Sequence, residues 1–133
     1  MRTTPVILML TLFFVSCTKE HSAPATGIYK GSFRREMSGG INKGAVAVTI
    51  TLKDGRFSGT SEDPHYPAIG FGRYTLDNET IQFVNESVFT ADFDWTLILN
   101  DRFNRTTAGD SIVWIRNEGD FVLTQDIYTL KKQ

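Results

Sequence analysis

Cysteine and histidine are scarce in this chain of 133 residues, which has one cysteine, Cys17, and two histidines, His21 and His65. A single cysteine cannot form an internal disulfide, so no covalent cross-link of that kind stabilises the fold. Zinc sites take three or four Cys, His or carboxylate ligands, and nucleophilic catalysis needs a base beside the nucleophile. With so few of these side chains, we expect no metal site, no cofactor and no enzymatic activity.

An excess of charge is also missing, because 14 Lys and Arg stand against 15 Asp and Glu, for a net charge of −1. Domains that bind nucleic acid carry a basic surface, so we expect no nucleic-acid partner. Long apolar runs are missing as well. The longest, over residues 6–15, has Thr11 within it and is shorter than the roughly 20 residues that a membrane-spanning helix needs.

The start of the chain has the layout of an export signal. Arg2 precedes the apolar run, Ser16 follows it, and Cys17 comes next; a charged residue, an apolar stretch and a small residue are typical of secretory signals. A lone cysteine at the end of such a signal resembles a bacterial lipobox. The resemblance implies cleavage before Cys17 and its acylation with fatty acids such as palmitate. The alternative is an ordinary signal peptide in which the cysteine is incidental.

A short polar segment separates this signal from the rest of the chain. Residues 18–26 are polar or small, contain a proline and show no periodicity, as in a flexible tether. We therefore expect a signal peptide at 1–16, a lipidated Cys17 with its tether over 17–26, and one domain over 27–133. The predicted location is the bacterial cell envelope, on the outer membrane, with the periplasmic and the surface face both open.

From residue 27 onward the sequence alternates between apolar and polar residues. In the clearest run, over 45–52 (AVAVTITL), Val, Ile and Leu alternate with Ala and Thr, the period-two pattern of a strand with one buried face. Asp54-Gly55 follows, which is a strong hairpin signal. Turn signals recur about every 8–12 residues, the spacing of a β-barrel or sandwich. The predicted strands cover residues 28–35, 44–53, 56–61, 71–76, 80–85, 95–103, 111–116 and 121–130.

We predict an all-β fold in which eight strands form an antiparallel up-and-down barrel, since closing the meander removes its two open edges. Gly27-Ile28-Tyr29 stands where lipocalins carry Gly-x-Trp at the start of the first strand. The domain thereby resembles the lipocalin-like, or calycin, barrels of small bacterial lipoproteins of the Bacteroidetes type. Arg116 and Lys131 are candidates for the arginine that packs over the lipocalin tryptophan.

Aromatic residues are the main clue to a binding site in the domain. An eight-stranded barrel is just wide enough to be filled by side chains or to hold one small ligand. The rings can line a cavity or fill the interior, and a small chain without cross-links favours the filled interior. If the barrel holds a ligand, we expect Phe57, Phe83, Trp95 and Trp114 to contact it.

The loop over 62–70 is a second candidate, because two prolines restrict it and Tyr66 stands beside the titratable His65. We predict that His65 and Tyr66 contact a partner; the alternative is an irregular connection without a role. Asp92 and Asp94 form a D-x-D pair. Because a hard-cation site needs six or more oxygen ligands in a compact loop, we expect these to be solvated carboxylates.

Two functions remain open at this point. The first is an envelope lipoprotein that holds a small apolar ligand in the barrel as a non-enzymatic binding module. The second is an interaction or inhibitor-type lipoprotein that acts on an envelope protein through an exposed loop at 62–70 on a solid barrel, comparable with the small β-barrel lysozyme inhibitors. In both, Cys17 attaches the protein to the membrane. A hollow interior lined by aromatic rings favours the first function, and a packed interior favours the second.

Overall fold

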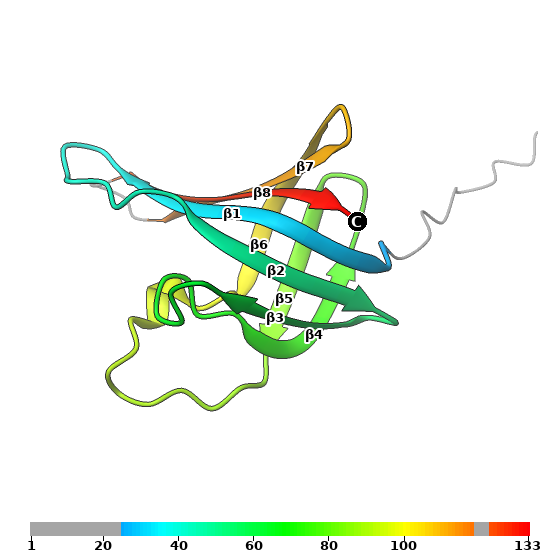
Figure 1. The fold of residues 1–133 in the computed structure, drawn as a ribbon, viewed down its shortest axis with the longest axis horizontal. Coiled ribbons are helices and arrows are strands. Elements are labelled where there is room, and N and C mark those ends of the chain that lie inside the picture. Colours follow the sequence, from blue (N-terminus) through cyan, green and yellow to red (C-terminus); the bar gives the residue numbers. More distant parts are fainter. Residues whose placement is uncertain (1–24, 119–122) are drawn as a thin grey trace, which may run out of the picture.

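The computed structural model describes residues 25–118 and 123–133. Within these residues eight antiparallel strands close into a barrel, in which each strand pairs with the next and β8 pairs with β1 (Figure 1). This up-and-down barrel confirms the predicted fold. The strands are β1 (Gly27–Met37), β2 (Val46–Lys53), β3 (Arg56–Ser61), β4 (Gly70–Leu76), β5 (Thr80–Asn85), β6 (Asp101–Ala108), β7 (Ser111–Glu118) and β8 (Thr124–Lys132).

Local sequence explains how the strands begin and turn. In β2, Val48, Ile50 and Leu52 are buried, whereas the residues between them are half-buried, as expected for a strand with one face toward a core. In the β2–β3 turn, Asp54 has a φ of 51° and Gly55 a φ of 76°. Two successive left-handed residues make the type I′ turn that suits a two-residue hairpin. The predicted Asp-Gly hairpin is therefore confirmed.

Aromatic side chains fill the interior of the barrel. Phe83 is central, since its ring centroid lies 5.1 Å from that of Phe57, 5.9 Å from Phe103 and 5.2 Å from Trp114. The contacts continue through Tyr128, which lies 6.0 Å from Trp114. The buried rings, each at most 4 % exposed, are those of Tyr29, Phe33, Phe57, Tyr74, Phe83, Phe103, Trp114 and Tyr128.

The two ends of the barrel differ in the length of their connections. The turns at one end cover residues 54–55, 77–79 and 109–110. The connections at the other end cover residues 38–45, 62–69 and 86–100. We call these the tight-turn end and the long-loop end. The start of β1 and the C terminus both lie at the tight-turn end, where Tyr29 pairs with Lys132 (Figure 1). Functional residues concentrate on loops that a rigid scaffold positions, which directs attention to the long-loop end.

The segment before β6 departs from the predicted strand over 95–103. Residues Trp95–Leu97 form a short 3-10 helix, η1, and β6 begins only at Asp101. The Asp94 carboxylate accepts a hydrogen bond from the Thr96 backbone N–H at 2.9 Å and so caps η1. Asp101, the first residue of β6, has a φ of 67°, so extended backbone does not continue from β6 back into residues 95–100. The other predicted strands agree with the structure within a few residues; positions 121 and 122 lie outside the described residues.

Arg116 and Lys131 do not pack over Tyr29, contrary to the lipocalin analogy. Arg116 lies at the long-loop end and Lys131 faces outward, whereas Tyr29 lies inside the tight-turn end. The charged group that acts on Tyr29 is Arg105 of β6. Burial raises the pKa of the Tyr29 phenol, and the positive charge of Arg105 opposes that rise. No helix among the described residues is long and apolar enough to cross a membrane.

Candidate functional site

Three of the four predicted ligand-binding rings come together in the barrel interior. Phe57 and Trp114 both contact Phe83, and all three side chains are at most 2 % exposed. Trp95 does not join them, because it lies in η1 with 66 % of its surface exposed. The prediction that Trp95 shares a site with the other three is therefore wrong. Trp95 points elsewhere because a 3-10 turn replaces the strand predicted over residues 95–103.

The segment over 62–69 closes the long-loop end instead of projecting from it. Tyr66 is buried, its ring packs edge-on against Phe33 at 5.1 Å, and its hydroxyl accepts a hydrogen bond from the Arg35 backbone N–H at 2.9 Å. Ala68 and Ile69 are buried as well. The prediction of Tyr66 as an exposed contact residue is therefore wrong, since the ring extends the aromatic core. His65 is the exposed member of the pair.

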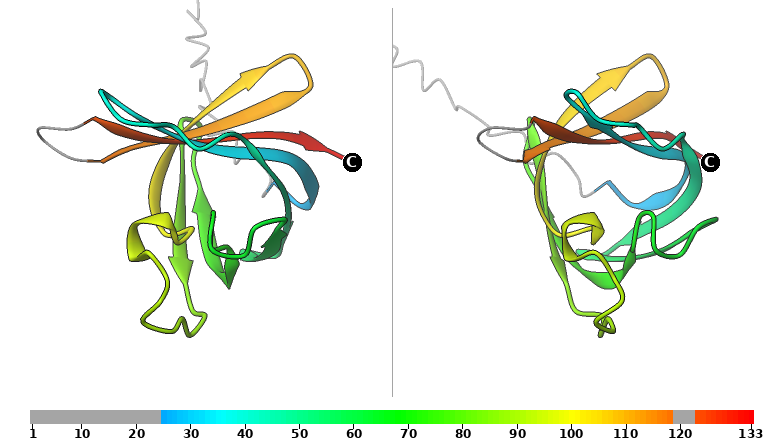
Figure 2. Two further views of the ribbon diagram at one scale, coloured as in Figure 1. Left: turned by 60° about the vertical axis from the view of Figure 1, so that its left-hand side comes forward. Right: turned by 90° about the vertical axis from the view of Figure 1, so that its left-hand side faces the viewer.

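The segment over 86–100 lies against this one. The Leu99 backbone N–H donates to the Ala68 carbonyl at 2.8 Å, and the Ala68 N–H donates to the Leu97 carbonyl at 3.2 Å. In the right-hand view of Figure 2, which faces the long-loop end, η1 and the 62–69 segment lie in front of the lower part of the ring of strands, and the loop before η1 extends below it. We call residues 62–69 and 86–100 together the plug.

His65 connects the two segments on the outside of the plug. Its ring stacks on Phe93 at a centroid distance of 4.1 Å, and its Nε2 lies 3.0 Å from Asp92 Oδ2. The ring of Phe93 in turn contacts Phe89 at 5.1 Å. Hydrogen bonds from the Thr90 hydroxyl and from His65 lower the pKa of Asp92. The D-x-D pair alone predicts only solvated carboxylates here, yet Asp92 contacts His65 and Asp94 caps η1.

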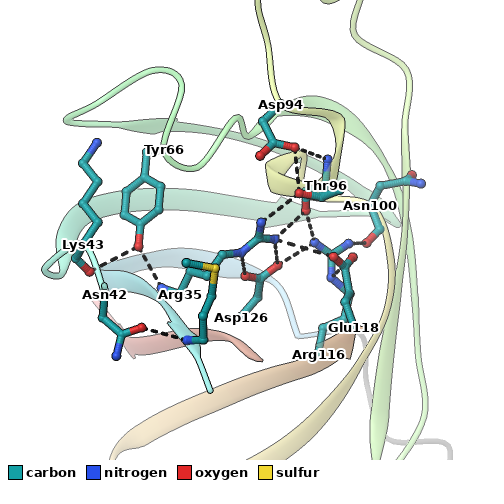
Figure 3. Close-up of polar contacts among 11 residues, drawn as sticks. Arg35, Asn42, Lys43, Tyr66, Asp94, Thr96, Asn100, Arg116, Glu118 and Asp126 are labelled. Atoms are coloured by element: carbon teal, nitrogen blue, oxygen red, sulfur yellow. Dashed lines mark hydrogen bonds and ion pairs between the residues drawn. The ribbon is translucent and has the colours of Figure 1, made fainter. Parts of the chain in front are cut away.

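A buried ionic network lies beneath the plug, inside the barrel (Figure 3). Asp126 of β8 is 1 % exposed and Arg116 of β7 is 8 % exposed. Arg35 of β1 binds both carboxylate oxygens of Asp126, at 2.6 and 2.8 Å, and Arg116 binds the same carboxylate at 2.7 Å. Glu118 lies 3.1 Å from Arg116 and adds a second negative charge. Two arginines and two carboxylates therefore balance each other.

The same arginines hold the plug in place. Both guanidinium groups donate to the Thr96 carbonyl, at 2.9 Å from Arg35 and 2.6 Å from Arg116. Arg116 also donates to the Asn100 carbonyl at 2.8 Å. Burial opposes the charge of Arg35, but the hydrogen bond and negative charge of Asp126 outweigh it and raise the pKa of Arg35. The two arginines of the network are paired with its two carboxylates, so no charge is left for a ligand. The role of the network is therefore to position η1.

Sequence analysis did not find this network, although a signal for it exists. Arg35 stands in phase with Phe33 on β1, and Arg116 stands in phase with Trp114 on β7. Charged residues at inward positions of strands need partners, because an unpaired buried charge is costly. The alternation in the sequence therefore marks both arginines as interior residues, but it does not identify Asp126 as their shared partner.

A cavity of about 140 Å³ opens at the outer side of the plug. Hydrogen bonds make its base rigid: the Asn85 side chain donates to the carbonyls of Ile69 at 2.6 Å and Leu99 at 3.0 Å, and the Asn85 N–H donates to Asn100 Oδ1 at 2.9 Å. The residues that line the cavity are Asn85, Ser87, Phe89, Trp95, Ile98 and Asn100.

Gly70 is required where this cavity meets β4. Its φ is +65°, and a Cβ at this position would lie 2.1 Å from Ser87 Oγ and 3.2 Å from Phe89 Cζ. Ser87 Oγ also bonds to the backbone of Phe71, since it accepts from the Phe71 N–H at 2.8 Å. The absence of a side chain at Gly70 thus lets Ser87 and Phe89 approach the barrel wall and form one side of the cavity.

Within the described residues, no group of three or more His, Cys, Asp and Glu side chains is arranged to hold a metal ion. Comparison of the chain with protein-family models, with curated proteins and with solved structures finds no match.

Proposed function

We propose that this chain is a lipid-anchored, non-enzymatic binding module of the bacterial cell envelope, and that it binds its ligand at the plug. The observation that carries the proposal is the filled interior, where eight aromatic side chains at most 4 % exposed occupy the barrel. An eight-stranded barrel has room either for its own side chains or for one small ligand. With the interior occupied, the outer surface of the plug is the favoured place for a ligand.

Exposed apolar side chains on the plug support this assignment. Val88 is 97 % exposed and Trp95 is 66 % exposed. Large apolar side chains that stay in water on an otherwise well-packed domain are frequent in binding surfaces, and tryptophan is enriched among the residues that contribute most to binding. The second predicted function, contact through a loop on a solid barrel, thereby moves from residues 62–70 to residues 86–100.

The proposed anchor leaves the plug free to meet a ligand. The described chain begins at Ala25, at the tight-turn end, and Cys17 precedes it by eight residues. Because an extended chain spans at most about 3.6 Å per residue, an acylated Cys17 stays within about 30 Å of that end. The attachment point is therefore at the tight-turn end of the barrel, opposite the plug.

Site-specific photo-cross-linking in the native host tests this function. A photoactivatable residue replaces Val88, whose 97 % exposure means that the core is untouched. The matched control is Asn78, an exposed residue in the β4–β5 turn at the tight-turn end. We expect covalent adducts, identified by mass spectrometry, from position 88 and not from position 78. Adducts at both positions or at neither contradict binding at the plug.

A small ligand inside the barrel is the second candidate. It is favoured by Tyr74 Oη and Trp114 Nε1, which are buried without a hydrogen-bond partner among the described residues. Buried polar groups normally have a partner, and a ligand could supply it. Native mass spectrometry of the wild type and of Trp95→Ala, each purified from the host, distinguishes the two candidates: a small molecule retained by both proteins favours the interior, and one retained by the wild type alone favours the plug.

A further inference from the structure

We propose that the cavity between Phe89 and Trp95 is the ligand site of the plug and that it takes one neutral sugar ring, a pyranose unit of a carbohydrate. The proposal deepens the proposed function, on which it rests, by naming the chemical class of the ligand. It follows from the volume of the cavity, from the chemistry of its lining and from the lining donors that have no protein partner among the described residues.

The volume fits a single six-membered ring. The cavity measures about 140 Å³, and a protein cavity of about 150 Å³ holds one benzene molecule. A lipid chain or a peptide segment of several residues is too large to be enclosed here. The ligand, or the part of it that enters, is therefore one ring.

The lining has no charge and combines apolar with polar groups. Phe89, Trp95 and Ile98 are apolar, and the other three lining side chains are two amides and one hydroxyl. A charged ligand would lose its hydration without gaining a counter-charge. A purely apolar ring would cover the Asn100 amide N–H groups without offering them an acceptor, which also costs free energy. A pyranose ring, with C–H groups on its faces and hydroxyls around its rim, matches both parts of the lining.

Two lining side chains have donors without a protein partner among the described residues, Trp95 through its indole N–H and Asn100 through its amide. The Asn85 amide donates to two backbone carbonyls, and Ser87 Oγ bonds to the Phe71 backbone. Asn100 differs, because its Oδ1 accepts from the Asn85 N–H while its Nδ2 has no protein partner among the described residues. Figure 3 shows the Asn100 amide on the far side from the arginines. Its N–H groups are therefore available to a sugar hydroxyl.

The aromatic walls are held in position before a ligand arrives. Trp95 belongs to η1, whose Thr96 carbonyl accepts hydrogen bonds from both buried arginines. Phe89 packs on Phe93, which stacks on His65. Trp95 nevertheless remains 66 % exposed, so one part of its ring is open to contact. Walls that are already fixed lower the entropy cost of binding. A small ring makes few contacts, so a site for it depends on this saving.

An aromatic side chain also lines hollows on the outer face of β2, β3 and β4. Two adjoining depressions there, of about 420 Å³ each, both contain Phe71, Thr51 and Ser58. These residues lie on the outward face of one sheet, so a ring placed there is contacted from one side. The cavity at Trp95 has two aromatic side chains in its lining, which favours it over the outer face.

Ligand-observed NMR with the acylated mature protein in phospholipid nanodiscs, free of glycoside detergents, tests the proposal. The probes are methyl β-glucopyranoside and N-acetylglucosamine as neutral sugars, glucuronate as a charged sugar, and benzyl alcohol as an apolar ring. We expect saturable binding of a neutral sugar, weakened at least about tenfold by Trp95→Ala. Asn100→Asp, which keeps the Oδ1 acceptor and removes the amide donors, should weaken it as well. Phe71→Ala is the matched aromatic control and should leave binding unchanged.

The possible outcomes separate this inference from the proposed function. Loss of binding in Phe71→Ala, but not in Trp95→Ala, overturns the site. Preference for benzyl alcohol or for glucuronate overturns the carbohydrate class but leaves binding at the plug intact. Absence of saturable binding by either neutral sugar, together with adducts from position 88, overturns the inference and supports the proposed function. Absence of both overturns both. Thermal melts of each variant ensure that lost binding reflects the site and not unfolding.

Discussion

The Asp126 side chain is 1 % exposed, and two arginines form ion pairs with its carboxylate. Arg35 binds it through two hydrogen bonds and Arg116 through a third. Buried ion pairs add little net stability compared with apolar packing, but removal of one partner leaves the other charged and unpaired. Arg35 and Arg116 also hold the Thr96 carbonyl, so the carboxylate supports the plug through them.

Asp126→Asn is expected to lower the free energy of unfolding by about 3–5 kcal/mol, because two buried guanidinium groups lose their shared counter-charge. Urea unfolding followed by tryptophan fluorescence measures the loss. The matched control is Asp110→Asn, which removes an ion pair with Lys131 in which both side chains are mostly exposed; we expect it to cost much less than Asp126→Asn, because water screens an exposed pair. Similar losses in the two variants would contradict the assigned role of the network.

Gly70 and Gly109 have nearly the same backbone but different surroundings. Their φ values are +65° and +64°, yet a Cβ at Gly70 would lie 2.1 Å from Ser87 Oγ, whereas at Gly109 it meets nothing within 4 Å. Gly109→Ala should therefore cost only the strain of a left-handed alanine, about 1–2 kcal/mol. Gly70→Ala should cost about 1–3 kcal/mol more and displace Phe89.

The difference in unfolding free energy between Gly70→Ala and Gly109→Ala measures the cost of the contact with Ser87, because both variants share the same backbone strain. Urea unfolding measures the difference, and sugar binding reports on the position of Phe89. Equal unfolding free energies for the two variants would mean that Ser87 moves aside without cost and that Gly70 is not needed for the cavity.

Among the elements, the plug is held by side-chain contacts on its outside and by buried arginines beneath it. On the outside, the ring of His65 stacks on Phe93 and its Nε2 contacts the Asp92 carboxylate. Exposed contacts of this kind contribute less to the free energy of unfolding than buried contacts do. The contact between His65 and Asp92 is therefore the part of the plug that a change of pH or salt concentration weakens most readily.

Acid is expected to loosen this outer contact. Hydrogen bonds from Thr90 and His65 lower the pKa of Asp92 below its ordinary value of 3.8. A carboxyl group with a lowered pKa contributes its stabilisation fully above the ordinary pKa, and this is lost as the pH falls from there through the lowered pKa. Amide hydrogen-exchange protection of residues 62–69 should therefore decrease as the pH falls below about 4.

Asp92→Asn supplies the control for this pH dependence. Without the carboxylate, protection of residues 62–69 should already be reduced at neutral pH and should change less on acidification. Exchange of β7 and β8, which contact neither His65 nor Asp92, should be the same in both proteins. If residues 62–69 of Asp92→Asn kept the amide protection of the wild type at neutral pH, the contact between Asp92 and His65 would not be what holds the plug.

For the molecule as a whole, the proposed attachment at Cys17 puts the anchor on the side of the tight-turn end, opposite the plug. Cys17→Ala is expected to abolish incorporation of labelled palmitate and to release the protein from the membrane fraction. Circular dichroism should be unchanged, since the described domain begins eight residues later. Cell fractionation and palmitate labelling measure the effect, with Thr18→Ala as the matched neighbouring control. Retained labelling in Cys17→Ala would overturn the anchor.

Much of the barrel could be predicted from sequence because its strands depend on local pattern. The alternation in β2 and the Asp54-Gly55 turn are formed by residues close together in the chain. The segment before β6 could not be predicted in this way. Its apolar residues alternate as in a strand, but the Asp94 cap and the left-handed Asp101 override the pattern. Trp95 was misplaced for this reason.

The order of residues alone therefore specifies the strands, their hairpins and the aromatic content of the interior, since each arises from neighbours in the chain. Only the closed barrel decides the rest. Arg35 and Asp126 are 91 residues apart in sequence and meet because β8 pairs with β1. Their network then fixes Thr96 and places Trp95 on the outside. Long-range pairing of buried charges, which no local pattern encodes, thus determines where the candidate site lies.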